Sequence, residues 1–180
     1  MKTKLPRRRL ALIVGLSIVG LLGVIAYAAT PTILSVGTTP HNDVLDGPAT
    51  VTFRNLVTPA GEVGTWHYHP GQVFNAVKRG SITVEDGCGG SETFTPGQAF
   101  ETIDGRVHRA INPGLDECED YNVFFNPPGT PLTVFIPNNE RRCGPPKSVN
   151  ECKNGGWANF THPVSFSNQG DCMESVIHQP

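Results

Sequence analysis

Residues 64–71 read GTWHYHPG and contain two histidines, His67 and His69, that lie two positions apart. If this segment is a strand, successive side chains alternate between the two faces of the sheet, so both imidazole rings point to the same side. Two neighbouring imidazoles on an inward face are costly to bury unless their lone pairs find a partner, and a metal ion is such a partner. The pair therefore predicts two ligands of a metal site inside a β-fold.

Short strand-like segments, each closed by a turn signal, lie on both sides of this stretch. The chain has 180 residues with 20 Gly and 16 Pro, and little helical periodicity follows residue 30. We expect strands at residues 32–36, 50–55, 64–69, 74–77, 81–86, 92–94, 99–103, 107–112, 121–125 and 132–136. Many short strands at close spacing are typical of a β-sandwich or a closed β-barrel.

A third histidine, His108, lies 39 residues after His69 in the predicted strand at residues 107–112. A barrel brings strands so separated into contact, and three imidazoles make an open site for Fe, Mn, Zn or Ni. The other interpretation of His108 is a core histidine bonded to a backbone carbonyl. The remaining histidines lie in turns or in the tail, and we expect them to be solvated: His41, His162 and His178.

The two histidine segments resemble the two sequence motifs of the cupin superfamily over residues 45–136. The first motif is Gly, five residues, His-x-His, three or four residues, Glu, six residues, Gly. The second is Gly, five residues, Pro-x-Gly, two residues, His, three residues, Asn. The matching positions are Gly61, His67, His69 and Gly80, then Gly97, Gly105, His108 and Asn112. The resemblance implies an all-β fold, the double-stranded β-helix or jelly-roll barrel, with a divalent metal on His67, His69 and His108.

Two positions depart from these motifs. Ile103 stands where the second motif has its proline, which touches no ligand. Val73 stands where the first motif has its glutamate, so the ligand set is reduced to three histidines, as in thiol dioxygenases and some other cupins. Gln72 would coordinate through its amide oxygen only if a bulge turned it inward. Glu101 is the nearby acidic group that we expect to accept a hydrogen bond from a ligand or to act as an acid or base.

These residues support two functional hypotheses of different classes. The first is an exported metal-binding cupin that binds or transforms a small molecule at the three-histidine site. As an enzyme it would be, by resemblance, a metal-dependent dioxygenase, isomerase or lyase. The second is a non-catalytic extracytoplasmic module that binds a sugar or a cell-wall fragment, with a structural metal or none. A plain scaffold with buried, hydrogen-bonded histidines is a third interpretation.

The N-terminal segment has the features of an export signal. Residues 1–9 carry five basic side chains, residues 10–25 are uncharged and mostly aliphatic, and residues 26–28 read Ala-Tyr-Ala. This order is typical of a signal peptide, and we expect cleavage after Ala28. An uncleaved membrane anchor is the alternative, because the uncharged run is nearly long enough to span a bilayer. The expected location is secreted or extracytoplasmic.

The charge that remains after the leader excludes nucleic acid as a partner. The leader holds five of the 14 basic residues, which leaves 9 basic and 16 acidic residues and no basic stripe. The acidic residues at 116–120 are expected to form a solvated hairpin loop. We expect a small-molecule ligand as the partner, and a homodimer and a membrane tether through the N-terminal segment are left open.

Five cysteines lie beyond the leader, and an oxidising compartment would pair them. We favour a disulfide between Cys152 and Cys172, which share a short Gly- and Asn-rich tail. The sequence does not decide among Cys88, Cys118 and Cys143, although we prefer Cys88 with Cys143. The expected division is a leader or anchor at 1–28, a barrel at 29–137, and a linker with a disulfide-stapled extension at 138–180.

Overall fold

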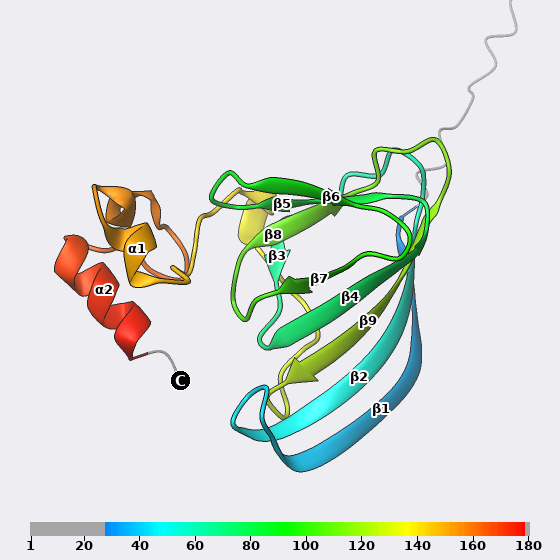
Figure 1. Ribbon diagram of the computed structural model, residues 1–180, viewed down its shortest axis with the longest axis horizontal. Helices are drawn as coiled ribbons and strands as arrows, with labels where there is room; N and C mark the ends of the chain where they lie inside the picture. Colours follow the sequence, from blue (N-terminus) through cyan, green and yellow to red (C-terminus); the bar gives the residue numbers. More distant parts are fainter. Residues whose placement is uncertain (1–27, 179–180) are drawn as a thin grey trace, which may run out of the picture.

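The computed structural model describes residues 28–178, and it contains two five-stranded antiparallel sheets that face each other (Figure 1). The leader predicted at 1–28 therefore lies almost entirely outside the described residues. One sheet has the order β1-β2-β9-β4-β7, and the other has the order β10-β3-β8-β5-β6. The strands are β1 (Thr30–Asn42), β2 (Gly47–Thr58), β3 (His67–Tyr68), β4 (Gln72–Arg79), β5 (Ile82–Asp86), β6 (Ser91–Phe94), β7 (Ala99–Thr102), β8 (His108–Ile111), β9 (Cys118–Asn126) and β10 (Val134–Phe135). The predicted jelly-roll barrel is confirmed.

The observed lengths of two strands, β1 and β3, differ from the predicted lengths. β1 extends over 13 residues, Thr30–Asn42, whereas we predicted a strand at 32–36 only, and Pro40 lies inside it. Because β1 is an edge strand, a residue without a backbone N–H is tolerated there. β3 is instead shorter than predicted and pairs only at His67 and Tyr68, because the chain bends at Pro70 and Gly71 before it enters β4.

The central strand of the first sheet, β9, supplies a polar inner wall. Its residues alternate between buried and more exposed positions. The five that face the interior are all at most 4% exposed: Cys118, Asp120, Asn122, Phe124 and Asn126. Three of these five side chains are charged or amides, so the apolar core does not fill the barrel. A polar wall of this kind leaves room for a ligand between the sheets.

Apolar side chains pack in two clusters on either side of the second sheet. Inside the barrel, Val77, Ile82, Phe94 and Cys118 form one cluster, and the ring of Phe94 stacks on Phe100 with centroids 4.2 Å apart. The other cluster joins Trp66, Val107 and Ile136, with Tyr68 packed against it. Because Trp66 and Tyr68 alternate with His67 along the chain, packing them on the outer side turns the imidazole inward.

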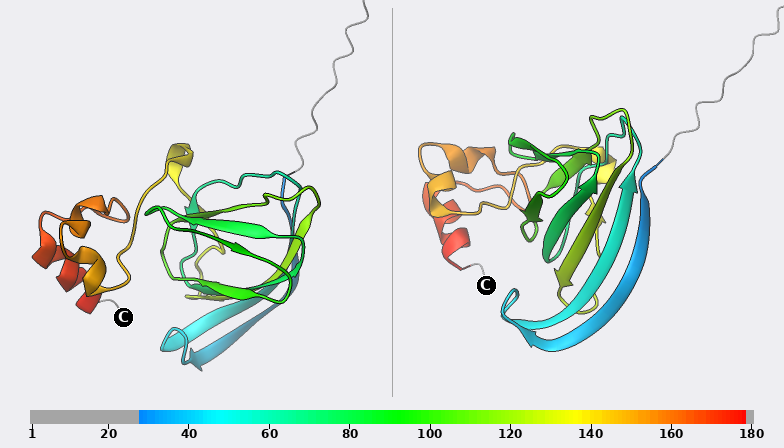
Figure 2. Two further views of the ribbon diagram at one scale, coloured as in Figure 1. Left: turned by 45° about the horizontal axis from the view of Figure 1, so that its top comes forward. Right: turned by 45° about the vertical axis from the view of Figure 1, so that its right-hand side comes forward.

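A small helical unit follows the barrel and lies beside it in both views of Figure 2. After the 3₁₀ turn η1 (Pro137–Asn139), it contains α1 (Val149–Cys152), η2 (Gly156–Asn159) and α2 (Gln169–Ile177). We had predicted an extension here but no helix in it. Its interior is a minimal cluster of cysteines and aromatic residues: Cys143, Cys152, Phe160 and Cys172, with Trp157, Phe166, Met173 and Val176 around them.

Disulfides and one buried arginine fasten this unit. The predicted pair Cys152–Cys172 is confirmed, and so is the preferred pair Cys88–Cys143, which joins the barrel to the segment before the helices. Cys118 is free and buried. Arg106, which is 6% exposed, pairs with Asp86 of the barrel and with Glu151 of α1.

Two disulfides indicate an oxidising, extracytoplasmic environment. Among residues 28–178, no helix has both the length and the apolar character needed to span a membrane.

Candidate metal centre

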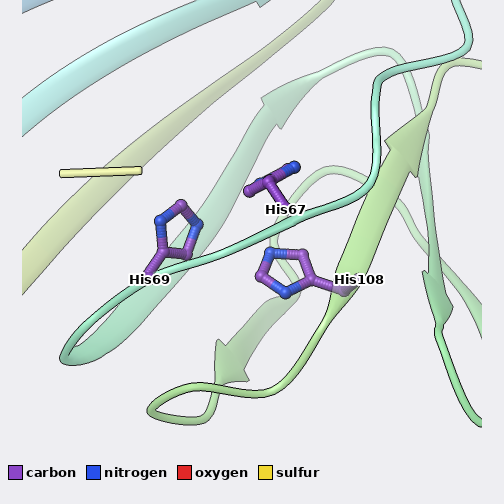
Figure 3. Close-up of side chains that lie close together, drawn as sticks. All are labelled: His67, His69 and His108. Atoms are coloured by element: carbon purple, nitrogen blue, oxygen red, sulfur yellow. The ribbon is translucent and has the colours of Figure 1, made fainter. Parts of the chain in front are cut away.

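The three predicted histidines converge at one point on the inner face of the second sheet (Figure 3). His67 of β3 lies directly opposite His108 of β8 in the antiparallel register, and His69 follows two residues after His67. The centroids of the His67 and His108 rings are 4.5 Å apart, and the His69 ring lies 5.0 Å from each. One nitrogen of each ring can be chosen so that all three lie within 4.8 Å of one another.

Each imidazole is held in place by a hydrogen bond on its Nδ1 atom. His67 Nδ1 lies 2.8 Å from the carbonyl oxygen of Thr65, and His108 Nδ1 lies 2.8 Å from that of Arg106. His69 Nδ1 lies 2.7 Å from the carbonyl oxygen of Leu132. A carbonyl oxygen only accepts, so each Nδ1 carries the proton and donates it. Each neutral ring therefore has its lone pair on Nε2, which is the arrangement that metal-ligating histidines adopt.

Burial keeps these rings neutral. Desolvation lowers the pKa of His67, and it lowers that of His69 well below the ordinary value, with the nearby imidazoles adding to the effect. For His108, which is 6% exposed, burial lowers the pKa to about 3. Neutral imidazole is the form that binds a metal ion. The cluster thus presents three unprotonated nitrogens to one point without the need to release protons near neutral pH.

The fourth ligand position of the cupin motif is apolar. Val73 is fully buried on the inward face of β4 and offers no ligand atom. Its neighbour Gln72 points the other way, and its amide nitrogen donates to Glu101 Oε2 at 2.9 Å. The alternative that Gln72 turns inward as a ligand is therefore wrong. Glu101 lies exposed on β7 and accepts no hydrogen bond from the three imidazoles, so its predicted role as their acceptor is wrong, whereas its role as an acid or base stays a prediction.

A cavity of about 280 Å³ lies between the sheets in front of the three histidines. The second sheet contributes the imidazoles and apolar side chains such as Val84 and Ala110 to its lining. The first sheet contributes polar groups from four adjacent strands: Arg54, Thr58, Asn75, Thr102, Asp120 and Asn122. The histidine cluster therefore has an open side, and that side is faced by groups able to hold a polar ligand.

A hydrogen-bonded network orders the polar wall around Asn122. The Nε atom of Arg54 donates to Asn122 Oδ1 at 2.7 Å. The amide nitrogen of Asn122 in turn donates to Asn75 Oδ1 at 2.9 Å and to a carboxylate oxygen of Asp120. Burial raises the pKa of Asp120 and lowers that of Arg54. Asn122 thus fixes an arginine and a carboxylate in the same cavity.

Sequence reasoning missed both of these charged residues. We placed Asp120 in a solvated loop with its acidic neighbours, but β9 carries it inside the barrel, where it is 4% exposed. Glu119, one position away, stays outside and pairs with Lys78 and Arg79. The signal that could have found Asp120 is its spacing of two residues from Asn122 and four from Phe124, because alternate residues of a strand share one face. Arg54 carried no such signal.

Comparisons with known proteins agree with the motifs. Residues 55–124 match the family model described as "Cupin domain", which covers β3 to β8 and most of β9. No curated protein matches the sequence.

Several solved structures share the architecture at low sequence identity. A double-stranded β-helix protein from Klebsiella pneumoniae is 18% identical with a TM-score of 0.47, and the match covers 61% of this chain and 84% of that one. A cupin domain from Bordetella pertussis is 20% identical with a TM-score of 0.43, and the match covers 56% and 95%. The DMSP lyase DddQ from Ruegeria pomeroyi is 15% identical with a TM-score of 0.49, and the match covers 63% and 54%. Identities at this level say nothing of the activity of this chain.

Proposed function

The barrel is a cupin domain, and from that premise we propose that His67, His69 and His108 hold one divalent metal ion at which a small molecule is bound or transformed. The observation that carries this proposal is the set of three Nδ1 atoms engaged by backbone carbonyls. It leaves three Nε2 lone pairs, from one partly buried and two buried histidines, without another partner among the described residues. A divalent cation is the partner that converging neutral imidazole nitrogens can share.

The geometry fits an ion of the first transition series or zinc. Imidazole–metal bonds of about 2.1 Å place the nitrogens of tetrahedral ligands about 3.4 Å apart. One nitrogen of each ring lies within 4.8 Å of the others, so closure around an ion needs the rings to approach one another by up to about 1.4 Å. Nitrogen-only ligation suits Fe, Mn, Zn or Ni, and a bound ion would act as a Lewis acid or as a site for O₂.

The residues of the chain itself would orient the small molecule and exchange protons with it. The polar wall faces the histidines across the cavity, so a ligand between them contacts both. Asp120 is the carboxylate of that wall, and burial raises its pKa, which is the direction that favours proton exchange with a ligand.

Elemental analysis of the purified protein tests the metal site. We expect close to one equivalent of a divalent metal in the wild type, and its loss in His67→Ala and in His108→Ala. His41→Ala is the matched control, because His41 is an exposed histidine outside the cluster. Circular dichroism spectra would show that the variants keep their fold. A wild-type protein that takes up no metal, even after incubation with Fe, Mn, Zn and Ni salts, would refute the proposal.

Val73 favours a second candidate function, a non-catalytic ligand-binding module. An apolar residue at the glutamate position removes one ligand and one negative charge, which is one route to a cupin that binds without turnover. Oxygen uptake and product analysis with panels of thiols, phenols and hydroxy acids separate the two candidates. Turnover that depends on both metal and His108 supports an enzyme, whereas saturable binding with no turnover supports the module.

We also propose that the chain is exported and cleaved after Ala28. Two disulfides support an oxidising destination. In addition, the backbone nitrogen of Ala29 donates to Glu62 Oε1 at 2.9 Å, so cleavage there would place a new ammonium group beside a carboxylate. N-terminal sequencing of protein recovered from the medium or the envelope would read Ala-Thr-Pro. An intact N-terminus on membrane-bound protein would instead support the anchor.

A further inference from the structure

Arg54 points into the cavity from β2 with its terminal nitrogens unused. Its Nε atom is bound to Asn122 Oδ1, and its Cζ atom lies 4.6 Å from the centroid of the Phe124 ring. The same ring meets the His69 ring edge-on at 5.2 Å, so one aromatic side chain lies against both the arginine and the histidine cluster. The two Nη groups have no hydrogen-bond or ion-pair partner within residues 28–178. The guanidinium is therefore fixed in orientation but keeps its paired donors.

Asp120 acts on this arginine through its charge but does not occupy the guanidinium donors. Asp120 raises the pKa of Arg54 through its charge, but the two side chains form no salt bridge, and Asn122 is the residue that bonds to each of them. A planar guanidinium with two free donors binds a carboxylate through two parallel hydrogen bonds. An anion delivered by a ligand would thus find in Arg54 a partner that the protein itself does not occupy.

Two buried hydroxyls give a second, independent indication of a ligand. Thr58 and Thr102 are 3% and 8% exposed, and both line the cavity. The Oγ1 atom of each has no hydrogen-bond partner among residues 28–178. A buried hydroxyl without a partner costs about 1–3 kcal/mol. Both side chains come from the same polar wall as Arg54, on β2 and β7, so a ligand that reaches the arginine lies beside hydroxyls that can bind its own polar groups.

We propose that this cavity recognises a small hydroxylated carboxylate, with the carboxylate group on Arg54 and hydroxyl groups on Thr58 and Thr102. The proposal rests on the proposed function in one respect, since the other end of the ligand would meet the metal held by the histidines. A volume of about 280 Å³ is just below the roughly 300 Å³ at which the usual range of small-molecule sites begins. The part of the ligand that lies inside the cavity is therefore the size of a short hydroxy acid or a single sugar acid.

Calorimetric titration of the purified protein with lactate, propionate, lactamide and inorganic phosphate tests this specificity. We expect lactate to bind most tightly. Propionate should be weaker because it lacks the hydroxyl group, and lactamide weaker still because it lacks the charge. Arg54→Met should weaken lactate binding roughly 10- to 100-fold, which is the loss of affinity expected when a hydrogen bond to a charged group is removed. Arg54→Lys should restore part of the affinity, since it keeps the charge but loses the paired donors.

Arg109→Met is the matched control for loss of an arginine over an aromatic ring. Arg109 Cζ lies 4.6 Å from the Trp66 ring, the same distance as Arg54 from Phe124, but it does not line this cavity and its Nε atom pairs with Glu85. Its substitution should leave lactate binding unchanged. Melting temperatures of all variants would establish that they are folded.

The metal content of each variant separates this inference from the proposed function. The Arg54→Met protein should retain its metal but bind lactate more weakly. Unchanged lactate affinity in a folded, metal-containing Arg54→Met protein would overturn the role of Arg54 and leave the metal site standing. Phosphate binding more tightly than lactate would overturn the carboxylate assignment. If the wild type holds no metal, the same titrations on wild type and Arg54→Met still decide whether Arg54 binds the anion.

Discussion

Acid should unfold the metal-free protein through His108. In the folded state burial lowers its pKa to about 3, against 6.5 for an unperturbed histidine. Between these two values the unfolded chain binds a proton that the folded chain does not. The stability that His108 contributes is therefore complete above about pH 6.5 and is lost progressively as the pH falls towards 3. His69 shifts in the same direction, so the value for His108 alone is a lower limit for the cluster.

The magnitude follows from the size of the shift. Each pH unit inside the window changes the free energy of unfolding by about 1.4 kcal/mol per group. From about pH 7 to about pH 4, His108 alone should remove about 3 kcal/mol. That is a large fraction of the roughly 5–15 kcal/mol by which a typical domain is stable.

Urea unfolding at a series of pH values, after removal of metal with a chelator, measures this loss. His108→Asn is the reference variant, because asparagine does not titrate and the carboxylates are the same in both proteins. The free energy of unfolding of the wild type should fall more steeply with acid than that of the variant, by about 3 kcal/mol between about pH 7 and about pH 4. Parallel pH dependences for the two proteins would refute the reasoning.

Three further substitutions test other parts of the structure. Val73→Glu restores the carboxylate of the cupin motif at a fully buried position, so it should raise metal affinity at least tenfold in a competitive chelator titration. Val77→Glu is the control, on the same face of β4 but in the apolar cluster, and it should only lower the stability of the fold. Replacing both Cys152 and Cys172 by serine removes a disulfide between residues 20 apart, and it should lower the free energy of unfolding in urea by about 3 kcal/mol. Equal stability of wild type and variant would contradict this. Thr58→Val removes an unpaired buried hydroxyl and should raise the free energy of unfolding by about 1 kcal/mol. Thr83→Val is the control and should give no such gain, because that hydroxyl is bonded to Thr93. A loss of stability in Thr58→Val would show that the Thr58 hydroxyl has a partner in the protein.

The convergence of the three histidines could be predicted because local backbone geometry determines it. His67 and His69 lie two residues apart and so share a face. The second motif supplied His108, and the antiparallel register places it opposite His67. Strand ends were predicted less well, because a proline near the end of a strand is compatible with an edge strand as well as with a turn. The helices of the extension are short and are held by two disulfides and a small cluster, so they carry almost no periodic signal.

The polar wall could not be predicted because β2 and β9 reverse the usual distribution of residues. On β2, Phe53 is 47% exposed while its neighbour Arg54 faces the cavity. On β9, Tyr121 is 41% exposed while Asp120 and Asn122 on either side are buried. Sequence reasoning assigns aromatic residues to the core and charged residues to solvent, which is correct for most strands. Here that rule selects the wrong face. On β9 the alternation of Asp120 and Asn122 is a sequence signal against it, whereas on β2 only the pairing with β9 reveals the cavity face.

This reversal is itself an argument for a ligand. A barrel of this size would be more stable if its inner wall carried apolar side chains, because buried amides and charges gain little from their hydrogen bonds and lose their hydration. Asn122 satisfies Arg54 Nε, Asp120 and Asn75 at once, which limits the cost, but it leaves the arginine donors and the threonine hydroxyls unpaired. A wall needed only for folding would have no reason to orient an arginine and leave its donors unused. Groups that are fixed in position and unpaired at the same time are those whose partners arrive from outside the protein.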